Sequence, residues 1–416
     1  MRGRPPLPGG PYLVVGLARS GVAAMRMLAP DVIGVDSREV SLEGFETHSG
    51  DGLDLLDRVK TVVKSPGVPQ EAPVIQAARA RGLTVTGELE LAWRLLPKTR
   101  FVAVTGTNGK TTTVELLGAI LRAAVAGNVG TPLGDYVGAE PPLIVCEASS
   151  FQLEDSSQFA PEIAVLINLG EDHLDRHGSV EDYHAAKLRI FANQAGDDIA
   201  VVPLGMDVPR SVTFGGPGAD LAHDGSKLTW RGEPLIDAGE IRLRGAHNLE
   251  NAMAAAAAAL AGGVEPERVR EVLRSFAGVP HRLEEVAERD GVLYVNDSKA
   301  TNVDAARVGI EAFEAQTVHA ILGGSLKGGG FAGLRSAVAD RCRAAYLIGA
   351  AEERLAADLE GTVPLHRCGD LATAVARARA AARPGETVLL SPACASYDQY
   401  SNFERRGQHF RELARG

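Results

Sequence analysis

The stretch Phe101-Val102-Ala103-Val104-Thr105-Gly106-Thr107-Asn108-Gly109-Lys110-Thr111-Thr112 decides the fold class. Its first four residues are apolar, which predicts a buried strand, and a helical pattern runs from Thr111 to about Ala124. A Gly-Lys-Thr sequence at a strand-to-helix junction lets backbone N–H groups and the helix N-terminus surround phosphate oxygens. The stretch therefore predicts a triphosphate-binding loop in an α/β domain.

The loop supplies a set of candidate ATP contacts. They are seven consecutive residues, Gly106, Thr107, Asn108, Gly109, Lys110, Thr111 and Thr112. Lys110 would place its ammonium group on the β- and γ-phosphates and act in catalysis, and the Thr111 hydroxyl would bind Mg²⁺. Val104 stands where this type of loop usually has its first glycine, so we expect a variant subclass. The alternative, a glycine-rich turn without a ligand, is disfavoured by the Gly-Lys-Thr sequence.

Composition places the chain among ordinary globular proteins. Of its 416 residues, 45% are hydrophobic and 23% are charged, and a prior of roughly 150 residues per domain predicts about three domains. A net charge of −10 argues against nucleic-acid binding. Four scattered cysteines without CxxC spacing disfavour disulfides and a zinc site. No stretch suits a signal peptide or a membrane span, so we expect a cytoplasmic protein without membrane partners.

Short apolar runs alternate with helical patterns along the chain, which is typical of parallel α/β sheets. We expect a Rossmann-like domain over residues 1–87, a P-loop ATPase-like central domain with a parallel sheet over 88–280, and a Rossmann-like domain over 281–416. The segment Phe276–Pro280 reads as the second linker, because Gly and Pro interrupt helices. The expected strands are Tyr12–Val15, Val32–Val35, Thr61–Val63, Thr84–Thr86, Phe101–Val104, Leu143–Cys146, Ala164–Ile167, Val292–Val295, His319–Leu322, Ala345–Ile348 and Val388–Leu390, and an Ala-rich helix is expected at Ala246–Ala261.

The part of the chain that follows the phosphate loop contains three candidate metal ligands. Glu147 ends a buried strand, at the edge where open α/β sheets gather ligands, and could bind Mg²⁺ or only cap the loop after it. His173 lies in the acidic turn Glu171–Asp175, but Mg²⁺ prefers oxygen, so a structural role weighs about equally. Lys187 falls on the apolar side of a helix that Ser179 would cap. It either extends to water or has a lowered pKa, and a neutral amine could take up carbon dioxide as an anionic carbamate.

The first expected strand leads into a second glycine-containing turn. Gly16–Gly21 follows that strand and Asp36 ends the next one, an arrangement similar to a dinucleotide fingerprint. Ala18 replaces the middle glycine and hinders close approach of a pyrophosphate, so NAD binding is doubtful while a uridine diphosphate could still be accepted. Ser65 opens another turn at the same sheet edge. Simple helix-sheet packing is the alternative.

Taken in order, these segments resemble the Mur ligases, the cytoplasmic enzymes that assemble the peptidoglycan precursor. The resemblance covers nearly the whole chain and includes the phosphate loop. Further matching motifs are Glu147–Glu154, Glu171–Asp175, Tyr183–Arg189 with the family's carbamylated lysine at Lys187, Gly245–Asn248 with Asn251, His281-Arg282 and Asp297–Asn302. The C-terminal segments Ser391–Ser396 and Asn402–Gly407 resemble the members that add D-glutamate to UDP-N-acetylmuramoyl-L-alanine.

The resemblance implies a role for each matching residue. It implies two Mg²⁺ ions, one held by Thr111 and Glu147 and the other by His173 and carbamylated Lys187, with His173 and Lys187 counted as catalytic. The implied nucleotide contacts outside the loop are Asn248, Arg282 and Asp297. The implied contacts to the UDP substrate are Arg19, Ser20, Asp36, Ser37, Ser65, Asn128, Ser149 and Gln152. The implied D-glutamate contacts are Thr301, Lys327, Ser396 and Phe403; Lys327 is less secure because Ser325-Leu326 lacks the usual acidic residue.

The implied reaction is an ATP-dependent amide synthesis through an acyl phosphate, with ATP, UDP-N-acetylmuramoyl-L-alanine and D-glutamate as the substrates of a monomeric enzyme. Positioning and charge neutralisation carry most of phosphoryl transfer, which fits Lys110 and two Mg²⁺ ions. Three other functions stay open at this stage. They are a folylpolyglutamate-synthase-like ligase, a dinucleotide-dependent oxidoreductase built on Gly16–Asp36, and a nucleotide-binding regulator without catalysis.

Overall fold

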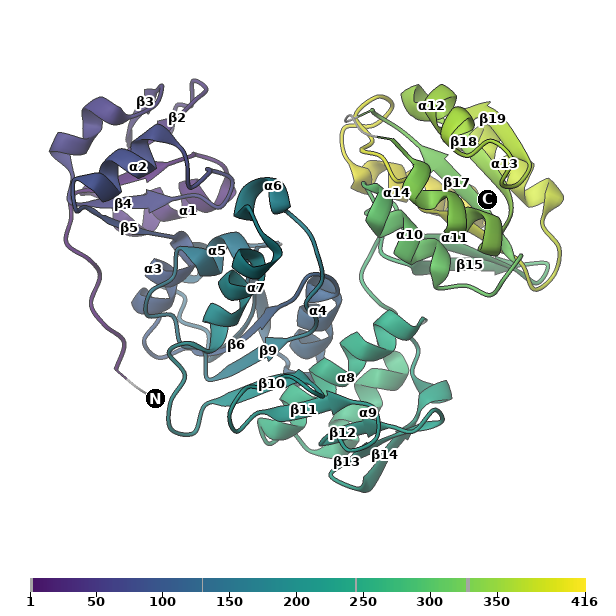
Figure 1. Ribbon diagram of the computed structural model, residues 1–416, viewed down its shortest axis with the longest axis horizontal. Helices are drawn as coiled ribbons and strands as arrows, with labels where there is room; N and C mark the ends of the chain where they lie inside the picture. Colours follow the sequence, from purple (N-terminus) through teal and green to yellow (C-terminus); the bar gives the residue numbers. More distant parts are fainter. Residues whose placement is uncertain (1–2, 129, 244, 327–329) are drawn as a thin grey trace. The chain divides into compact units, whose positions relative to one another are not determined.

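The computed structural model describes residues 3–128, 130–243, 245–326 and 330–416. The chain forms two compact units: unit 1 contains residues 1–241 and 250–275, and unit 2 contains residues 242–249 and 276–416. Unit 1 holds two β-sheets and unit 2 holds one, with helices packed on them (Figure 1). The predicted α/β class is confirmed, while the exact domain limits at 87 and 280 stay predictions. Within the described ranges, no helix is both long and apolar enough to cross a membrane.

The first sheet of unit 1 has five parallel strands in the order β3-β2-β1-β4-β5. Its elements are β1 (Tyr12–Val15), α1 (Arg19–Leu28), β2 (Val32–Asp36), β3 (Glu46–Ser49), the 3₁₀ helix η1 (Leu53–Arg58), β4 (Thr61–Lys64), α2 (Pro73–Ala80) and β5 (Thr84–Thr86). Side chains alternate along β1, so Leu13 and Val15 pack with α2 while Tyr12 and Val14 pack with α1. The strand order reverses between β1 and β4, which opens a crevice at the carboxyl ends of the strands.

The second sheet of unit 1 has nine strands in the order β14-β13-β12-β11-β10-β9-β6-β8-β7. Its strands are β6 (Arg100–Thr105), β7 (Ala124–Gly127), β8 (Leu143–Glu147), β9 (Ile163–Leu166), β10 (Ile199–Pro203), β11 (Val212–Gly215), β12 (Leu221–His223), β13 (Lys227–Trp230) and β14 (Glu233–Asp237). The helices around it are α3 (Glu88–Leu95), α4 (Lys110–Leu121), η2 (Leu133–Tyr136), α5 (Ser150–Glu154), α6 (Leu174–His177), α7 (Val180–Leu188), η3 (Arg189–Phe191), η4 (Ala238–Glu240), α8 (Ala246–Ala261) and α9 (Pro266–Ser275).

Two details of this sheet differ from the sequence expectations. The expected parallel sheet is parallel from β7 to β12, but β12, β13 and β14 pair antiparallel. The expected helix end near Ala124 is wrong, because α4 stops at Leu121, Arg122 turns left-handed at φ 53°, and Ala124 begins β7 by pairing with Ile144. Pairing within the sheet overrides the helix propensity of the alanines.

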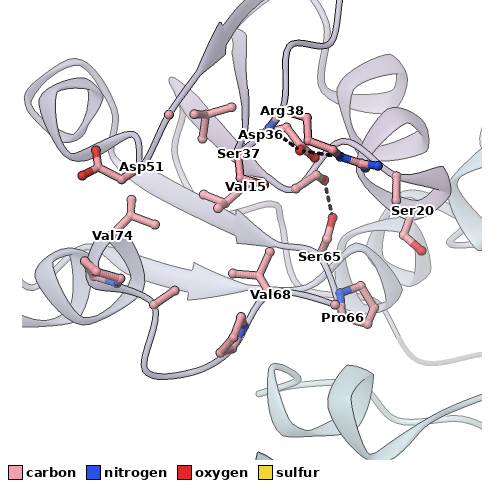
Figure 2. Close-up of a pocket in the computed structure, with 18 of the residues that line it drawn as sticks. Val15, Ser20, Asp36, Ser37, Arg38, Asp51, Ser65, Pro66, Val68 and Val74 are labelled. Carbon is pink, nitrogen blue, oxygen red and sulfur yellow. Dashed lines mark hydrogen bonds and ion pairs between the residues drawn. The ribbon is translucent and has the colours of Figure 1, made fainter. Parts of the chain in front are cut away.

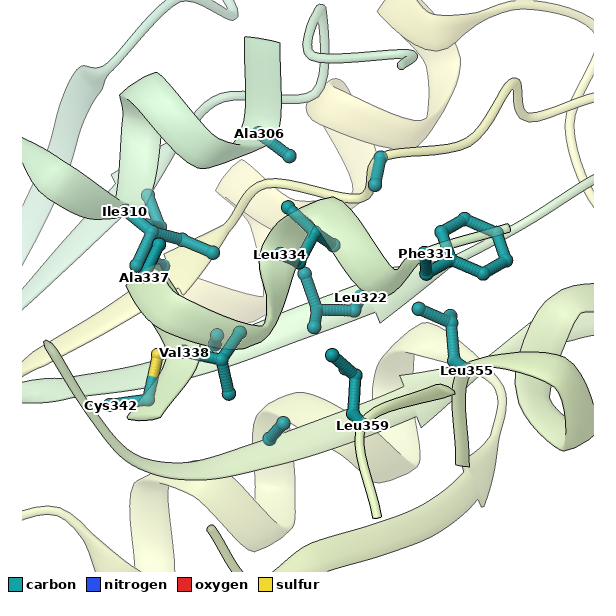
Figure 3. Close-up of a cluster of buried hydrophobic side chains, with 14 of the residues drawn as sticks. Ala306, Ile310, Leu322, Phe331, Leu334, Ala337, Val338, Cys342, Leu355 and Leu359 are labelled. Atoms are coloured by element: carbon teal, nitrogen blue, oxygen red, sulfur yellow. The ribbon is translucent and has the colours of Figure 1, made fainter. Parts of the chain in front are cut away.

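The sheet of unit 2 has six strands in the order β15-β16-β20-β17-β18-β19, all parallel except β15. Its elements are β15 (Glu284–Arg289), β16 (Val292–Asn296), α10 (Val303–Glu311), β17 (Val318–Gly323), η5 (Ala332–Leu334), α11 (Arg335–Arg341), β18 (Cys342–Ile348), η6 (Gly349–Ala351), α12 (Glu352–Asp358), β19 (Leu365–Gly369), α13 (Leu371–Ala381), β20 (Thr387–Leu390) and α14 (Phe403–Arg415). On one face, Leu322 packs with α10, α11 and α12, as Figure 3 shows. On the other face, Ile321 packs with α13 and α14. Both faces of this parallel sheet are thus buried.

Candidate active site

The phosphate loop connects β6 to α4 and closes around Gly109. This residue precedes α4 with φ +83°, a left-handed conformation that favours glycine. A Cβ atom built on Gly109 would lie 1.9 Å from Oδ1 of the buried Asn251 on α8. Both constraints require glycine at this position. No side chain of residue 109 therefore covers the backbone N–H groups at the N-terminus of α4, which phosphate binding uses.

Two lysines converge on the carbonyl of Gly106. Nζ of Lys110 donates to the carbonyl oxygens of Gly106 and Thr107, each at 2.8 Å. Nζ of Lys187, which comes from α7, donates to the same Gly106 oxygen at 2.8 Å. Both side chains therefore place an amino group at the loop, where the charge of Lys110 would stabilise an anionic phosphate chain.

Glu147 at the end of β8 accepts hydrogen bonds from two neighbouring segments. The Thr111 hydroxyl donates to Glu147 Oε2 at 2.9 Å, and Asn128 Nδ2 donates to Glu147 Oε1 at 3.0 Å. Glu147 is only 1% exposed. The hydroxyl and carboxylate together are the hard oxygen donors that Mg²⁺ prefers. Among the described residues there is no group of three or more His, Cys, Asp or Glu side chains placed to hold a metal.

Lys187 is buried on α7, whose N-cap is Ser179 as expected. Its ammonium group lies 4.2 Å from the centre of the Tyr183 ring, so the predicted contact with that apolar side of the helix is confirmed. Burial, reinforced by the nearby charge of Lys110, lowers the pKa of Lys187 to about 7. A large fraction of this amine is therefore neutral at physiological pH, which is the form that can react with carbon dioxide.

His173 belongs to a group of aromatic rings beside Lys187. Its ring centre lies 5.0 Å from that of Phe151 and 6.3 Å from that of Tyr183. His173 is half exposed, with φ 53°, and its Nε2 lies 3.5 Å from Asp172 Oδ2. The ring of His177 also stacks on Phe151, with the two ring centres 5.1 Å apart. Burial lowers the pKa of His177. The predicted pair His173 and Lys187 thus shares one neighbour, Tyr183, which the sequence reasoning had not given a role.

A cavity of about 710 Å³ occupies the crevice between β1 and β4 in unit 1 (Figure 2). Six of the residues expected to bind the UDP substrate line it: Arg19, Ser20, Asp36, Ser37, Ser65 and Asn128. The volume falls in the range of small-molecule sites, roughly 300–1,000 Å³. The structure therefore brings these six residues together around one hollow, at the topological switch point where such sheets bind ligands.

Asp36 and Ser65 shape the two sides of this cavity. The Asp36 carboxylate accepts hydrogen bonds from the backbone N–H groups of Leu17 at 2.8 Å and Arg38 at 3.0 Å, and the Leu17 bond is the main reason that its pKa is lowered. The Ser65 hydroxyl donates to the Gly16 carbonyl oxygen at 2.6 Å. Arg38 also lines the cavity, with Nε 3.5 Å from Asp36 Oδ1. Sequence reasoning missed Arg38, because no motif marks a single arginine after a strand.

Ser149 and Gln152 form the N-terminal cap of α5 and lie outside this cavity lining. Ser149 N and Oγ both donate to Gln152 Oε1 at 3.0 Å, and Gln152 N donates to Ser149 Oγ at 3.3 Å. Gln152 Nε2 is buried and has no hydrogen-bond partner among the described residues. An unpaired buried donor is costly, so this amide is suited to a ligand oxygen.

The remaining predicted residues belong to unit 2, whereas the phosphate loop belongs to unit 1. Asp297 is buried after β16, accepts from the Ser391 hydroxyl at 2.7 Å, and has its pKa raised to about 7 by burial. Asn248 is buried, and Arg282 is half-buried. Thr301, Ser396 and Phe403 follow the carboxyl ends of β16 and β20. Lys327 lies outside the described residues.

Comparisons with known proteins identify two family domains in the chain. The sequence profile of the Mur ligase middle domain matches residues 104–259, and that of the Mur ligase glutamate ligase domain matches residues 281–394. Among solved structures, the UDP-N-acetylmuramate–alanine ligase of Thermotoga maritima has a TM-score of 0.61 at 18% identity, covering 98% of this chain and 99% of that one. A MurF ligase from Thermotoga maritima, solved with ADP, has a TM-score of 0.59 at 19% identity, covering 97% and 95%. Both show the same fold.

Curated relatives are considerably more similar in sequence. Proteins called UDP-N-acetylmuramoylalanine–D-glutamate ligase from Anaeromyxobacter dehalogenans and Acidobacterium capsulatum are 43% and 42% identical to this chain. The alignments cover 99% and 98% of this chain and 98% and 96% of those relatives. The relative of the same name from Myxococcus xanthus is 42% identical, with 98% of each chain covered. The chain therefore belongs to the Mur ligase family, in the group of UDP-N-acetylmuramoylalanine–D-glutamate ligases.

Proposed function

We propose that this protein forms an amide bond between UDP-N-acetylmuramoyl-L-alanine and D-glutamate while it converts ATP to ADP and phosphate. The observation that carries the proposal is an identity of 42–43% to ligases of that name over nearly the whole chain. The geometry fits two of the three substrates, ATP and the UDP-linked one, because unit 1 contains both a phosphate loop and a cavity sized for a nucleotide-linked substrate. The family membership disfavours the oxidoreductase and the non-catalytic regulator.

The proposed chemistry has two steps. In the first, a carboxylate oxygen of the alanyl group bonds to the γ-phosphorus of ATP, the bond to the β-phosphate oxygen breaks, and ADP leaves. In the second, the amine nitrogen of D-glutamate bonds to the acyl carbon, the acyl–oxygen bond breaks, and phosphate leaves while the nitrogen loses a proton. Lys110 and the backbone amides of the loop would hold the phosphates in line and neutralise charge that develops there.

The oxygen and amine groups of the site fit the metal ions and the carbamate that we expect. Thr111 and Glu147 already share a hydrogen bond at 2.9 Å and would hold one Mg²⁺. His173 and a carbamate on Lys187 would hold a second, because carbamylation turns the buried amine into an anionic oxygen donor. Bound Mg²⁺ supplies positive charge that favours phosphoryl transfer.

The substrate contacts are proposed residue by residue. The cavity residues Arg19, Ser20, Asp36, Ser37 and Ser65 would bind the uridine diphosphate end. Asn128, Ser149 and Gln152 would contact the muramoyl portion, where the unpaired Gln152 Nε2 would donate to a substrate oxygen. Asn248, Arg282 and Asp297 would contact the nucleotide of ATP, and Thr301, Lys327, Ser396 and Phe403 would contact D-glutamate. We also propose that the enzyme is a cytoplasmic monomer, the latter testable by sedimentation against its mass of 43.7 kDa.

An isotope experiment tests the acyl phosphate. UDP-N-acetylmuramoyl-alanine is labelled with ¹⁸O in its alanyl carboxylate and incubated with the enzyme, ATP, Mg²⁺ and D-glutamate. The proposal expects one ¹⁸O atom per turnover in the released phosphate and a product heavier by one glutamyl residue. Product formation with unlabelled phosphate would contradict the acyl phosphate, and absence of any product would contradict the ligase function.

A further inference from the structure

Arg406 on α14 is a buried arginine that connects three loops of unit 2. It is 1% exposed. Its Nε donates to the Ser298 hydroxyl at 2.9 Å, and its Nη2 donates to the carbonyl oxygens of Ser298 and Cys394 at 2.9 and 3.0 Å. Its Nη1 donates to the carbonyl oxygens of Gly323 and Ala395 at 3.4 and 3.3 Å. Every nitrogen of the guanidinium group is therefore used within the protein.

The three loops leave the same edge of the sheet. Ser298 follows β16, Gly323 ends β17, and Cys394 and Ala395 follow β20. These strands are parallel neighbours, so their carboxyl ends meet at one edge. A planar guanidinium group can bond several carbonyl oxygens at fixed angles, which makes Arg406 a rigid connector of the three loops.

Among the residues that the structure describes, no carboxylate forms an ion pair with Arg406. None of the ion pairs among the described residues includes Arg406. The carboxylate of Asp398 acts on it only through space, since its oxygens accept from the Ser325 hydroxyl and the Ala350 N–H at 3.2 and 3.0 Å. Burial lowers the pKa of Arg406 to about 10, which leaves the side chain charged at neutral pH. A buried charge paired only with neutral dipoles favours an anion nearby.

The residues proposed to contact D-glutamate lie next to these hydrogen bonds. Ser396 directly follows Ala395, and Thr301 lies three residues after Ser298. The Ser298 hydroxyl, which accepts from Arg406, donates to the carbonyl oxygen of Phe403 at 2.8 Å. A shift of Arg406 would therefore move all three described members of the proposed amino-acid site.

We propose that Arg406 is a positioning residue that selects an acidic amino acid: it fixes the loops carrying Thr301, Ser396 and Phe403, and its unneutralised charge attracts the substrate carboxylates. It does not touch the substrate, because its nitrogens are buried and all donate to the protein. The inference rests on the proposed function, since it concerns recognition of D-glutamate in that reaction.

Two substitutions separate the charge of Arg406 from its shape. Arg406→Lys keeps the positive charge but loses the planar fork, and Arg406→Gln loses both. Arg411→Gln is the matched control, because Arg411 lies on the same helix but its charge is neutralised by Glu284, with Nη2 2.6 Å from Oε1. Initial rates of phosphate release are measured while ATP, the UDP substrate and D-glutamate are varied in turn, and D-glutamine replaces D-glutamate to test charge selection.

We expect Arg406→Gln to raise the KM for D-glutamate about tenfold or more and to reduce the preference for D-glutamate over D-glutamine by a similar factor. The KM values for ATP and the UDP substrate should change by less than about twofold, as should every KM of Arg411→Gln. Arg406→Lys should raise the KM for D-glutamate while it keeps the preference for D-glutamate. This split between selectivity and affinity is a result that a merely structural arginine would not give.

Three results would overturn the inference: an unchanged KM for D-glutamate in folded Arg406→Gln, a parallel rise of all three KM values, or an equal effect in Arg411→Gln. If Arg406→Gln does not fold, Arg406→Lys decides, and an unchanged KM for D-glutamate in that variant would also overturn it. A wild-type enzyme that releases no phosphate in response to D-glutamate would instead contradict the proposed function.

Discussion

Lys110 and Lys187 donate hydrogen bonds to the same acceptor, the carbonyl oxygen of Gly106, each at 2.8 Å. One lysine begins α4 and the other lies near the end of α7, so the fold brings two amino groups from distant parts of the sequence to one peptide group. Their repulsion is one cause of the lowered pKa of Lys187. A single carbonyl thus links the phosphate-binding loop to the lysine that we expect to be carbamylated.

Lys187 gives a prediction about pH. Because its pKa is lowered to about 7, Lys187 becomes protonated as the pH falls below that value, and only the neutral amine takes up carbon dioxide. With ¹³C-bicarbonate, the enzyme should show a ¹³C carbamate signal at pH 8 that disappears on acidification below pH 7. Lys187→Ala should lack both the signal and activity, and short-chain carboxylic acids should restore part of the activity. Full activity of the variant without rescue would reject the carbamate.

Lys110 gives a prediction about catalysis. Lys110→Ala should lower kcat by roughly 10²–10³ or more, because it removes charge that stabilises the transition state of phosphoryl transfer. Its melting temperature should change little compared with this loss of activity, since the hydrogen bonds of Lys110 to the Gly106 and Thr107 carbonyls lie within the loop itself. Lys98→Ala is the control, because Lys98 is 79% exposed on the same unit. Wild-type turnover of Lys110→Ala would exclude the proposed role of the loop.

Gly109 gives a prediction about nucleotide binding. Gly109→Ala should weaken ATP binding at least about tenfold, because the new Cβ would lie 1.9 Å from Asn251 Oδ1 and the φ of +83° is strained for alanine by roughly 1–3 kcal/mol. Gly205→Ala is the control for a glycine-to-alanine change at positive φ outside the loop, since Gly205 has φ +95° but no heavy atom within 4 Å of a built Cβ. Titration calorimetry with ATP and Mg²⁺ measures both variants. Equal affinities of wild type and Gly109→Ala would show that the contact with Asn251 does not shape the loop.

Glu88 at the start of α3 gives a prediction about stability. Burial raises its pKa from the ordinary 4.5 to about 7 in the folded protein, so the unfolded chain releases this proton more easily. The contribution of Glu88 to stability is therefore fully present below pH 4.5 and is lost as the pH rises through about 7, by up to about 3 kcal/mol. Glu88→Gln, which keeps an acceptor for the Gly134 N–H, should be more stable than the parent at pH 8 and equal to it near pH 4.

Trp93 on the same helix provides a local measurement of this effect. In a Trp230→Phe background, Trp93 is the only tryptophan, and its fluorescence reports urea unfolding near Glu88. Glu71→Gln is the control, because Glu71 is exposed. A stability difference between Glu88→Gln and its parent that does not grow with pH would contradict the predicted ionisation.

Sequence patterns predicted the elements that follow simple rules. The bounds of β1, β5 and α8 agree with the expected Tyr12–Val15, Thr84–Thr86 and Ala246–Ala261. β1 and α8 have strong apolar or alanine-rich patterns, and β5 consists of β-branched residues. The strand β3 (Glu46–Ser49) was missed because none of its residues is buried, and β13 and β14 were missed because their pattern lacks a continuous apolar run.

The sequence predicted individual residues of the candidate site but not the contacts between them. Gly106–Thr112 carries a recognisable motif, and its place at the junction of β6 with α4 is confirmed. The sequence could not reveal that Lys187 reaches the Gly106 carbonyl, because that contact joins residues 81 positions apart. Arg38 and Arg406 were also missed as site residues. Their positions depend on which strands are neighbours, and sequence spacing does not specify this.

The most direct test of the account is phosphate release by the purified enzyme from ATP and Mg²⁺ with UDP-N-acetylmuramoyl-L-alanine, comparing D-glutamate with L-glutamate. We predict release that requires the UDP substrate, proceeds with D-glutamate and is at least about tenfold slower with L-glutamate. Release at equal rates with both enantiomers, or release that does not depend on the UDP substrate, would contradict the account.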